Sequence, residues 1–256
     1  MQTFLIPALK DNYIHLIRQE NPGFCTVVDP ATAEPVKTFL QSRGWSLDLI
    51  LNTHHHPDHV GGNKELKGSY GCPAWGPAPA PGHPGISGLD RHLSEGQMLS
   101  IGNKLCLVIE VPGHTLDHIA LYFPEQKWLF VGDTLFSVGC GRLFEGTAEQ
   151  MWSSLNKLLP LPSETQIYSA HEYTLQNIEF ALSLEPDNEN LRQWQAQARE
   201  LRQEGLPTLP TNLGREKLCN PFLRPHSPSL RQNLGLSLGA SDLEVFAATR
   251  QAKDQF

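Results

Sequence analysis

Four apolar runs of this chain each end in a histidine or an aspartate. They are L47-D-L-I-L-N-T-H54, L105-C-L-V-I-E-V-P-G-H114, K127-W-L-F-V-G-D133 and Q166-I-Y-S-A-H171. Short apolar runs bounded by turn residues are typical of buried strands. In layered α/β structures the loops that follow the strands converge at one end, where sites form. The repetition therefore predicts a layered α/β fold with these four side chains gathered at one edge.

The first run leads into T53-H-H-H-P-D-H-V-G-G62, which holds four histidines and one aspartate within six positions. The proline favours an extended conformation at the residue before it, so His54 and His56 can point to the same side, as residues two apart on a strand do. The histidine between them then points away. Beyond the proline the chain turns and leaves Asp58 and His59 facing another direction. One loop can therefore offer two groups of ligands.

Imidazole and carboxylate groups are ligands that divalent metals such as zinc accept in proteins, and a single metal needs only three or four of them. A histidine-rich surface loop with adventitious metal affinity would explain the cluster alone, but not the three matching strand ends elsewhere. Three residues stay open at this point. His55 has no assigned role, His118 is a ligand or a packed or supporting histidine, and Asp29 orients the ligand loop or is an ordinary turn aspartate.

The spacing of apolar residues changes near residue 172. Before it, β-rich runs alternate with turns; after it, apolar residues follow helical spacing with Gly or Pro between the segments. We predict an α/β domain over 1–172 and a small helical domain over 173–256. The expected elements are strands at 4–9, 12–18 and 24–29, a helix at 34–43, a Pro/Gly-rich surface loop at 76–85, and helices at 178–184, 191–204 and 242–253.

Composition excludes several classes of protein. The net charge of −7 weakly opposes a nucleic-acid-binding surface. No apolar run approaches the roughly 18 to 20 residues that span a bilayer, and the amino terminus has no secretory signal. The five cysteines are scattered and form no CxxC pair, which indicates reduced thiols. We therefore expect a cytoplasmic monomer that binds neither nucleic acid nor membrane.

The ligand pattern H54-x-H56-x-D58-H59, followed by His114, Asp133 and His171, resembles the metallo-β-lactamase superfamily. That resemblance implies an αββα sandwich with a two-metal site at one edge. Four further stretches are similar to bacterial glyoxalase II, the hydroxyacylglutathione hydrolase family, and the similarity includes the helical tail. They are G132-D-T-L-F-S-V-G-C-G-R-L-F-E-G-T147, A170-H-E-Y-T174, N220-P-F-L-R224 and K253-D-Q-F256.

The resemblance implies two divalent metal ions per chain, with zinc expected and iron or manganese acceptable to the same ligands. It places His54, His56 and His114 on one metal, Asp58, His59 and His171 on the other, and Asp133 between them. It also makes 173–256 a substrate-binding domain, with glutathione contacts at Arg142, Phe144, Tyr173, Arg250 and Lys253. Some relatives carry lysine at Arg142, which keeps the charge. Some carry tyrosine at Phe144, so a hydroxyl contact is missing here.

The implied reaction cleaves S-D-lactoylglutathione, an S-2-hydroxyacylglutathione, to glutathione and D-lactate, the second step of methylglyoxal detoxification. Two cations about 3.5 to 4 Å apart can lower the pKa of a shared water toward neutrality and so supply hydroxide. The catalytic carboxylates would be Asp133, between the metals, and Asp58, which could orient the attacking oxygen. A thiol pKa of about 8.5 lets the glutathione leave as an anion without a general acid.

Other functions share part of this pattern. A glutathione persulfide dioxygenase of the same fold uses one metal and fewer ligands. A lactonase, β-lactamase or nuclease shares the metals but not the tail. A structural metal centre predicts a closed coordination shell, whereas seven ligands for two metals leave room for water. For Arg250 and Lys253, the alternative to carboxylate binding is a solvated helix face.

Overall fold

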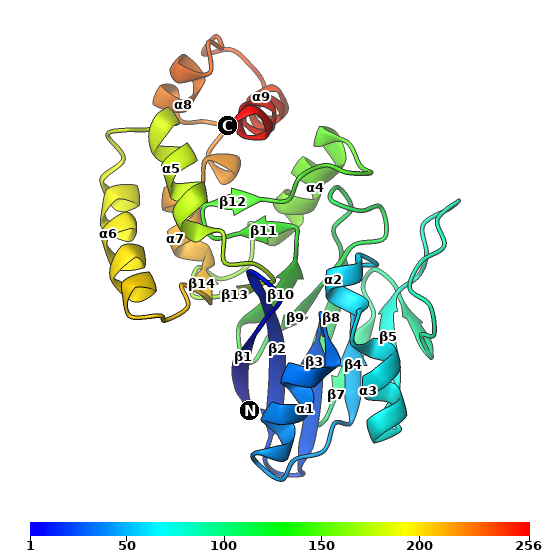
Figure 1. Ribbon diagram of the computed structural model, residues 1–256. Coiled ribbons are helices and arrows are strands. Elements are labelled where there is room, and N and C mark those ends of the chain that lie inside the picture. The colour runs from blue at the N-terminus through cyan, green and yellow to red at the C-terminus, as the bar shows by residue number, and fades with distance from the viewer.

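The computed structural model of the protein describes residues 1–256 and contains two six-stranded sheets (Figure 1). In spatial order the first sheet contains β1 (Gln2–Ala8), β2 (Asn12–Gln19), β3 (Phe24–Val28), β4 (Leu49–Leu51), β5 (Ala74–Pro77) and β6 (Arg91–Leu93). The second contains β14 (Thr211–Asn212), β13 (Gln166–Ser169), β10 (Trp128–Gly132), β9 (Ile119–Phe123), β8 (Lys104–Glu110) and β7 (Met98–Ile101).

Buried apolar side chains show how the layers stack. Successive residues of a strand face opposite sides of its sheet. In β4, Ile50 belongs to the apolar cluster shared with helices α1 (Ala33–Gln41) and α3 (Asn63–Tyr70), whereas Leu49 and Leu51 belong to the cluster between the two sheets. Helix α4 (Ala148–Leu158) covers the far face of the second sheet. The predicted αββα sandwich is confirmed.

The ligand-bearing strand ends lie at one edge of this sandwich. Strand β10 pairs parallel with β13, and β9 runs antiparallel to both β8 and β10, so the carboxyl ends of β8, β10 and β13 point the same way. The Ile119 amide donates to the Thr53 carbonyl at 2.9 Å, which joins the segment after β4 to the start of β9. The four predicted strand ends therefore meet.

Most predicted elements of the first part exist with small shifts of their bounds. The expected strands at 4–9, 12–18 and 24–29 are β1, β2 and β3, and the expected helix at 34–43 is α1. Helix α4 was not predicted, although Thr147 and Gln150 form a capping box at its start that the sequence T147-A-E-Q150 could have revealed. The short hairpin of β11 (Leu135–Phe136) and β12 (Gly139–Cys140) was also missed.

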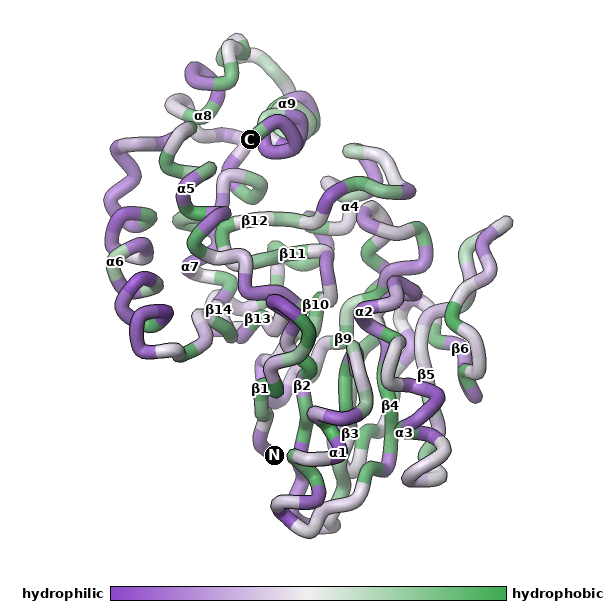
Figure 2. Tube along the Cα trace, in the orientation of Figure 1, coloured by the Kyte–Doolittle hydropathy of each residue, from purple (hydrophilic) through white to green (hydrophobic).

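The second part is mostly helical and lies at one side of the sandwich (Figure 1). It contains α5 (Thr174–Leu184), α6 (Glu189–Gln203), α7 (Leu213–Cys219), a 3-10 turn (Pro221–Leu223), α8 (Pro228–Asn233) and α9 (Asp242–Gln255). Figure 2 shows long hydrophilic stretches on α6, in contrast to the apolar central strands. Strand β14 of this part pairs with β13, so the two predicted domains share a sheet. The division after residue 172 stays a prediction.

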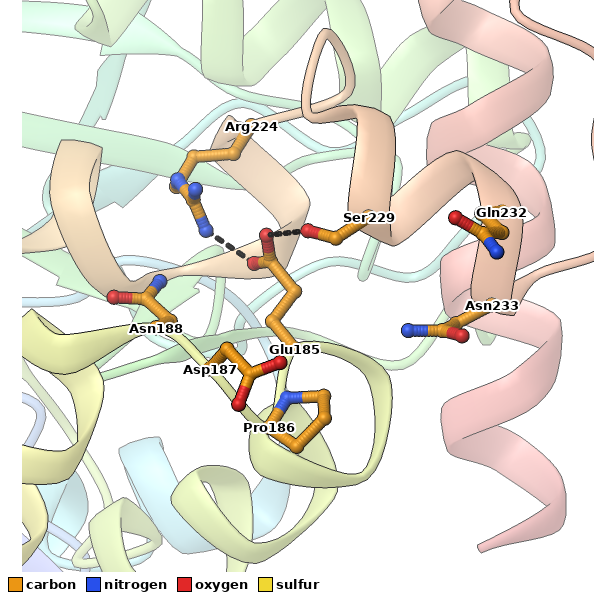
Figure 3. Close-up of a pocket in the computed structure, with 8 residues that line it drawn as sticks. All are labelled: Glu185, Pro186, Asp187, Asn188, Arg224, Ser229, Gln232 and Asn233. Atoms are coloured by element: carbon orange, nitrogen blue, oxygen red, sulfur yellow. Dashed lines mark hydrogen bonds and ion pairs between the residues drawn. The ribbon is translucent and has the colours of Figure 1, made fainter.

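A buried carboxylate ties the helical part together. Glu185, just after α5, pairs with Arg224 and accepts a hydrogen bond from the Ser229 hydroxyl at 3.1 Å (Figure 3). It also accepts one from the Ser227 hydroxyl at 2.6 Å. Buried carboxylates need such partners because an uncompensated charge in the interior is costly. The contacts fix the end of α5 against the segment that leads into α8.

Two predictions from composition concern the whole chain. All five cysteines are free, in agreement with the expected reduced thiols. None of the helices combines the length and the apolar composition that a bilayer crossing requires.

Candidate metal centre

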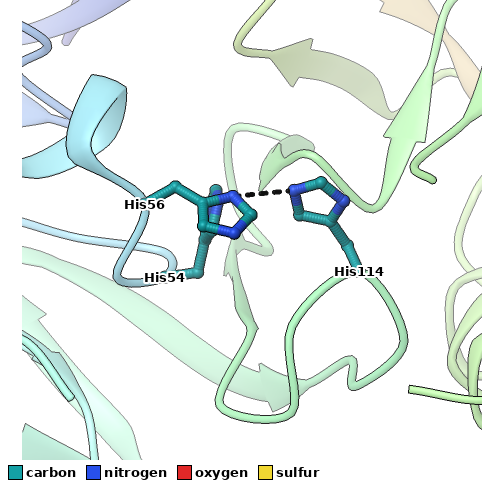
Figure 4. A group of neighbouring side chains, drawn as sticks. All are labelled: His54, His56 and His114. Carbon is teal, nitrogen blue, oxygen red and sulfur yellow. Dashed lines mark hydrogen bonds between the residues drawn. The ribbon is translucent and has the colours of Figure 1, made fainter. Parts of the chain in front are cut away.

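Three histidines from two loops form the first group of possible ligands. His54 and His56 follow β4, and His114 follows β8. The His56 Nδ1 atom lies 3.1 Å from the Nε2 atoms of both His54 and His114 (Figure 4). A tetrahedral zinc ion with nitrogen ligands at about 2.0 to 2.1 Å separates those nitrogens by about 3.3 Å. The three nitrogens therefore already lie close to the spacing that one metal requires.

The second group combines a carboxylate with two imidazoles. His56 is extended, with φ −61° and ψ 144°, and the short helix α2 (Pro57–Val60) then begins at the proline. This turn carries Asp58 and His59 away from the first group. Asp58 Oδ2 lies 3.4 Å from His171 Nε2 and 3.7 Å from His59 Nε2. The division of the loop into two directions, expected from the proline, is present.

Asp133 lies between the two groups. Its Oδ2 is 3.4 Å from the Nε2 atoms of both His114 and His171, and its Oδ1 is 3.5 Å from His59 Nε2. Asp133 Oδ1 and His59 Nε2 are buried, and neither has a hydrogen-bond partner. Unpartnered buried polar atoms cost about 1 to 3 kcal/mol each, and a cation between them would satisfy both. This donor set fits two divalent metal ions.

A second protein contact orients four of the candidate histidines. In each case the nitrogen that faces away from the centre bonds to a protein oxygen, which fixes the ring and its tautomer. The contacts are His54 Nδ1 to Thr53 Oγ1 at 3.0 Å, His59 Nδ1 to Asp29 Oδ2 at 3.1 Å, His114 Nδ1 to the Arg142 carbonyl at 2.8 Å, and His171 Nδ1 to Asp11 Oδ1 at 2.8 Å.

Asp29 and His118, whose roles the sequence did not decide, belong to neither ligand group but contact residues of the centre. Asp29 has a positive φ of 51° and accepts from the Thr53 amide at 2.8 Å and hydroxyl at 2.7 Å, besides contacting His59. It therefore orients the ligand loop and is not an ordinary turn residue. His118 is in neither ligand group; its Nε2 accepts from the Asp133 amide at 3.1 Å and its ring stacks on His54. It supports the carboxylate between the groups.

The two groups differ in their electrostatics. Burial lowers the pKa values of His54, His56 and His114, so these imidazoles are neutral at pH 7. Burial also acts to lower the pKa values of His59 and His171, but Asp133 and the neighbouring carboxylates outweigh it and raise them to about 10 and about 11. Metal binding to the second group must therefore displace protons, whereas the first group offers free lone pairs.

The two carboxylates of the centre are both held ionised. Burial opposes the charge on Asp133, but His59 and His171 outweigh that effect and place its pKa well below the usual range. A hydrogen bond from His171 lowers the pKa of Asp58. The Asp58 side chain is 36% exposed and that of Asp133 9%, so Asp58 is the carboxylate that solvent reaches.

A cavity of 610 Å³ opens beside His114 and Asp133. It lies between the edge of the sandwich and the helical part, because α5 and α9 supply one of its walls. The five residues for which glutathione contacts were predicted all line it: Arg142, Phe144, Tyr173, Arg250 and Lys253. The sequence thus selected residues that share one cavity although they are spread over more than a hundred positions.

These five residues differ in how they are held. The side chain of Arg142 is 60% exposed, with its Nε 3.4 Å from Asp254 Oδ1. Arg250 is 7% exposed and donates to the Cys140 carbonyl at 2.8 Å and to Asp254 Oδ1 at 2.9 Å, so it is not part of a solvated helix face. Lys253 lies 5.1 Å from the Phe180 ring, and burial lowers its pKa.

The two aromatic residues connect the cavity to the metal centre. Phe144 is 61% exposed, and its ring centroid lies 5.2 Å from that of His114 and 5.7 Å from that of His56. Tyr173 stacks on His171 at 4.7 Å. Each aromatic ring therefore contacts a different ligand group, and a molecule in the cavity lies next to both.

Four residues that contact the candidate ligands or His55 could not be identified from the sequence. Asp11 lies in the turn before β2, Asn12 is the first residue of β2, and Asp117 and Glu145 lie in loops. Each meets its partner only through the fold. Asn12 donates to Asp58 Oδ2 at 3.0 Å. His55, which points away from both ligand groups as expected, meets Asp117 and Glu145. A turn carboxylate looks the same in a sequence whether or not a histidine is folded against it.

Comparison with known proteins gives matches over the whole chain. The model of the "Metallo-beta-lactamase superfamily" matches residues 10–171, and that of "Hydroxyacylglutathione hydrolase C-terminus" matches residues 172–256. The chain is 48% identical to the hydroxyacylglutathione hydrolase of Methylococcus capsulatus, covering 100% of this chain and 99% of that one. It is 51% identical to the enzyme of the same name from Rhodospirillum rubrum, covering 98% and 97%.

A solved structure is similar to about two thirds of the chain. It is described as a di-iron-bound form, is 28% identical to this chain, and has a TM-score of 0.55. The similarity covers 67% of this chain and 92% of that protein.

Proposed function

The chain belongs to the hydroxyacylglutathione hydrolases of the metallo-beta-lactamase superfamily, and we propose that it hydrolyses S-2-hydroxyacylglutathione thioesters, S-D-lactoylglutathione among them. The products are glutathione and the free 2-hydroxy acid, which makes this the second step of methylglyoxal detoxification. The observation that carries the proposal is the cavity that joins three cationic side chains to the candidate metal ligands His114 and Asp133.

Two metal ions would be held by the seven predicted ligands. We assign His54, His56 and His114 to one ion, Asp58, His59 and His171 to the other, and Asp133 to both. When bound, the ions would act as Lewis acids and lower the pKa of a water toward neutrality. Zinc suits this donor set, and iron or manganese are also accepted by it. The similar structure in a di-iron-bound form supports iron as the main alternative.

Asp58 is the residue we assign to orienting the attacking water. Its carboxylate is ionised, solvent reaches it, and Asn12 holds one of its oxygens. A hydrogen bond from the water to this carboxylate directs the oxygen lone pair toward the thioester carbonyl. A carbon–oxygen bond then forms, the carbon–sulfur bond breaks, and the protons of the water pass to solvent. A thiol pKa of about 8.5 lets glutathione leave as a thiolate without a proton donor.

The glutathione arm lies in the cavity in this proposal. Arg142 is the cation that can reach a carboxylate directly, because its guanidinium is largely exposed and is held by one ion pair, to Asp254, beside the Phe144 ring. Arg250 fixes β12 through the Cys140 carbonyl and orients Asp254, so its contribution is to shape the wall. Lys253 adds positive charge beside the Phe180 ring. These cations counter the net charge of −7 where an anionic substrate binds.

The alternatives from the sequence are less supported. A persulfide dioxygenase or a lactonase of this fold would not account for the match of the hydroxyacylglutathione hydrolase C-terminus over residues 172–256. The second ligand group is also complete, as a two-metal hydrolase requires.

The proposal is tested by assaying hydrolysis of S-D-lactoylglutathione on protein of measured metal content. Turnover is expected from the metal-loaded wild type and from Asp187→Ala, which removes an exposed carboxylate far from the centre. Asp133→Ala is expected to abolish it. Absence of thioesterase activity in wild-type protein that carries two metal ions would reject the proposed function.

A further inference from the structure

His55 lies between the ligands His54 and His56 in the chain, but its ring faces two carboxylates outside the centre. Its Nδ1 lies 2.9 and 3.0 Å from the two oxygens of Asp117. Its Nε2 lies 3.2 Å from Glu145 Oε1. Both ring nitrogens are thus occupied, each by a different acidic residue.

Possible ligand atoms of these three residues lie close enough to one another for a further metal ion. Their arrangement instead favours a clamp, that is, one imidazole ring held between two carboxylates. The two carboxylates lie at opposite nitrogens of one ring, so a single cation could not use both without breaking one contact. Other donors also satisfy the carboxylates: the Thr115 hydroxyl donates to Asp117 Oδ1 at 2.7 Å, and the Leu116 amide donates to Glu145 Oε2 at 2.8 Å. The cluster is complete without a cation.

The clamp joins three loops that build the site. His55 belongs to the ligand loop after β4. Asp117 belongs to the loop after β8, which carries His114. Glu145 belongs to the loop 141–147 between β12 and α4, which carries Arg142 and Phe144. His83 adds a fourth segment, since its Nδ1 lies 3.5 Å from Glu145 Oε1.

Glu145 makes the polar contact between the loop 141–147 and the ligand loop after β4, through His55. No other residue of the loop 141–147 forms a hydrogen bond or ion pair with the ligand loop. Three of the other hydrogen bonds of the loop 141–147 go to the loop after β8: the His114 ring to the Arg142 carbonyl at 2.8 Å, the Phe144 amide to the His114 carbonyl at 3.3 Å, and the Gly146 amide to the Gly113 carbonyl at 3.0 Å. Further polar contacts go to the Thr134 carbonyl, Asp254 and Gln150. Glu145 is also the neighbour of Phe144, which lines the substrate cavity. Moving Glu145 would move the cavity rim.

We propose that His55 is a positioning residue. Its contacts with Asp117 and Glu145 fix the position of the loop 141–147, which lines the substrate cavity, relative to the ligand loop after β4. The inference rests on the proposed function, because it concerns where the glutathione arm is held relative to the reacting carbonyl. The glutathione arm and the reacting carbonyl belong to one molecule, so the two loops that hold them must be fixed to each other for both to bind at once.

The test compares two thioesters with the same 2-hydroxyacyl group, one of glutathione and one of a small neutral thiol. For Glu145→Ala we expect KM for the glutathione thioester to rise roughly five- to tenfold, with kcat within about twofold. KM for the small thioester and the metal content per chain should not change. Glu149→Ala, in an exposed position of the same region, is the matched control and should behave as wild type.

A double-mutant comparison separates a clamp from independent contacts. His55→Ala should raise KM for the glutathione thioester as Glu145→Ala does, and the double variant should be no worse than His55→Ala alone. Additive effects, or an equal rise in KM for both thioesters, would overturn the proposal. If the alanine variants do not fold, Glu145→Gln replaces Glu145→Ala; it keeps one acceptor and should give a smaller rise in KM, and an unchanged KM would count against the clamp. Loss of all thioesterase activity in wild type would instead reject the proposed function.

Discussion

The metal centre and the cavity beside it are built in opposite ways. Four of the candidate histidines have a second protein contact that fixes their rings, and the carboxylate between the groups is buried. On the cavity rim, Arg142 and Phe144 are mostly exposed. The reacting groups are therefore placed before substrate arrives, whereas the exposed side chains of the rim can adjust to it on a fixed backbone. Changes in the centre should lower kcat, and changes in the rim should raise KM.

The largest effect should come from Asp133. In Asp133→Asn the side chain keeps its shape but loses the charge that both ligand groups share. We expect kcat to fall roughly 1,000-fold or more, since two-metal hydrolysis depends on both ions. Metal analysis should show fewer than two ions per chain. A variant that retained near-normal kcat would show that the centre does not need a shared carboxylate.

Removal of Asp29 should weaken the centre without touching a ligand. Asp29→Ala frees the His59 ring and the Thr53 amide and hydroxyl from their common acceptor. Loss of such an outer contact typically costs about 10- to 100-fold in metal affinity. Competition with a chelator measures it. Unchanged affinity would mean that packing alone holds the His59 ring.

On the rim, Arg142→Ala should raise KM for a glutathione thioester about tenfold and leave kcat within about twofold. The exposed guanidinium makes only a solvent-exposed ion pair with Asp254, which contributes little to stability, so Tm should stay the same. Arg250→Ala should differ, because this buried side chain bonds to the Cys140 carbonyl and Asp254. We expect it to lower Tm as well as raise KM. If both variants changed KM and Tm in the same way, Arg142 could not be distinguished as a substrate-binding residue from Arg250 as a residue that shapes the cavity wall.

The pH dependence of the metal-free protein should expose the difference between the ligand groups. Contacts with carboxylates, against the effect of burial, raise the pKa of His59 to about 10 and that of His171 to about 11, above the value of about 6.5 in an unfolded chain. Their protonation stabilises the fold fully below about pH 6.5, and this stability is lost as pH rises through about 10. Tm of metal-free protein should therefore fall between about pH 7 and pH 10.

Metal-loaded protein is the control for that titration. Bound metal removes the protons from the second group, so its Tm should change less over the same range. Equal pH dependence with and without metal would show that these two histidines do not hold protons in the metal-free fold.

The smallest expected effect concerns Phe144. A tyrosine at this exposed position adds a hydroxyl at the cavity rim without disturbing the contacts of the ring with His56 and His114. One added hydrogen bond contributes about 0.5 to 1.5 kcal/mol, so Phe144→Tyr should lower KM about two- to tenfold. An unchanged KM would place the glutathione arm away from this ring.

A site residue could be predicted from the sequence only where the residues next to it in the chain indicate its role. His54, His114, Asp133 and His171 could be identified because each follows an apolar run, and Pro57 explains the division of the cluster. Asp117 and Glu145 could not, since they meet His55 across 62 and 90 positions and nothing beside them marks that partner. The layered α/β fold followed from strand patterns, whereas the αββα order of the layers came from the resemblance to the superfamily. The strands β11 and β12 were missed because two-residue strands carry no periodicity.

Strand β14 gives the helical tail a second role. It borders β13 through Gln166 and Ile167, five and four positions before the candidate ligand His171. Without it, β13 would present a row of free backbone donors and acceptors, which other chains can pair with. The tail thus protects the edge of the sheet that supports the chemistry. Shortening or exchanging it between relatives carries a risk of aggregation that is independent of what the tail binds.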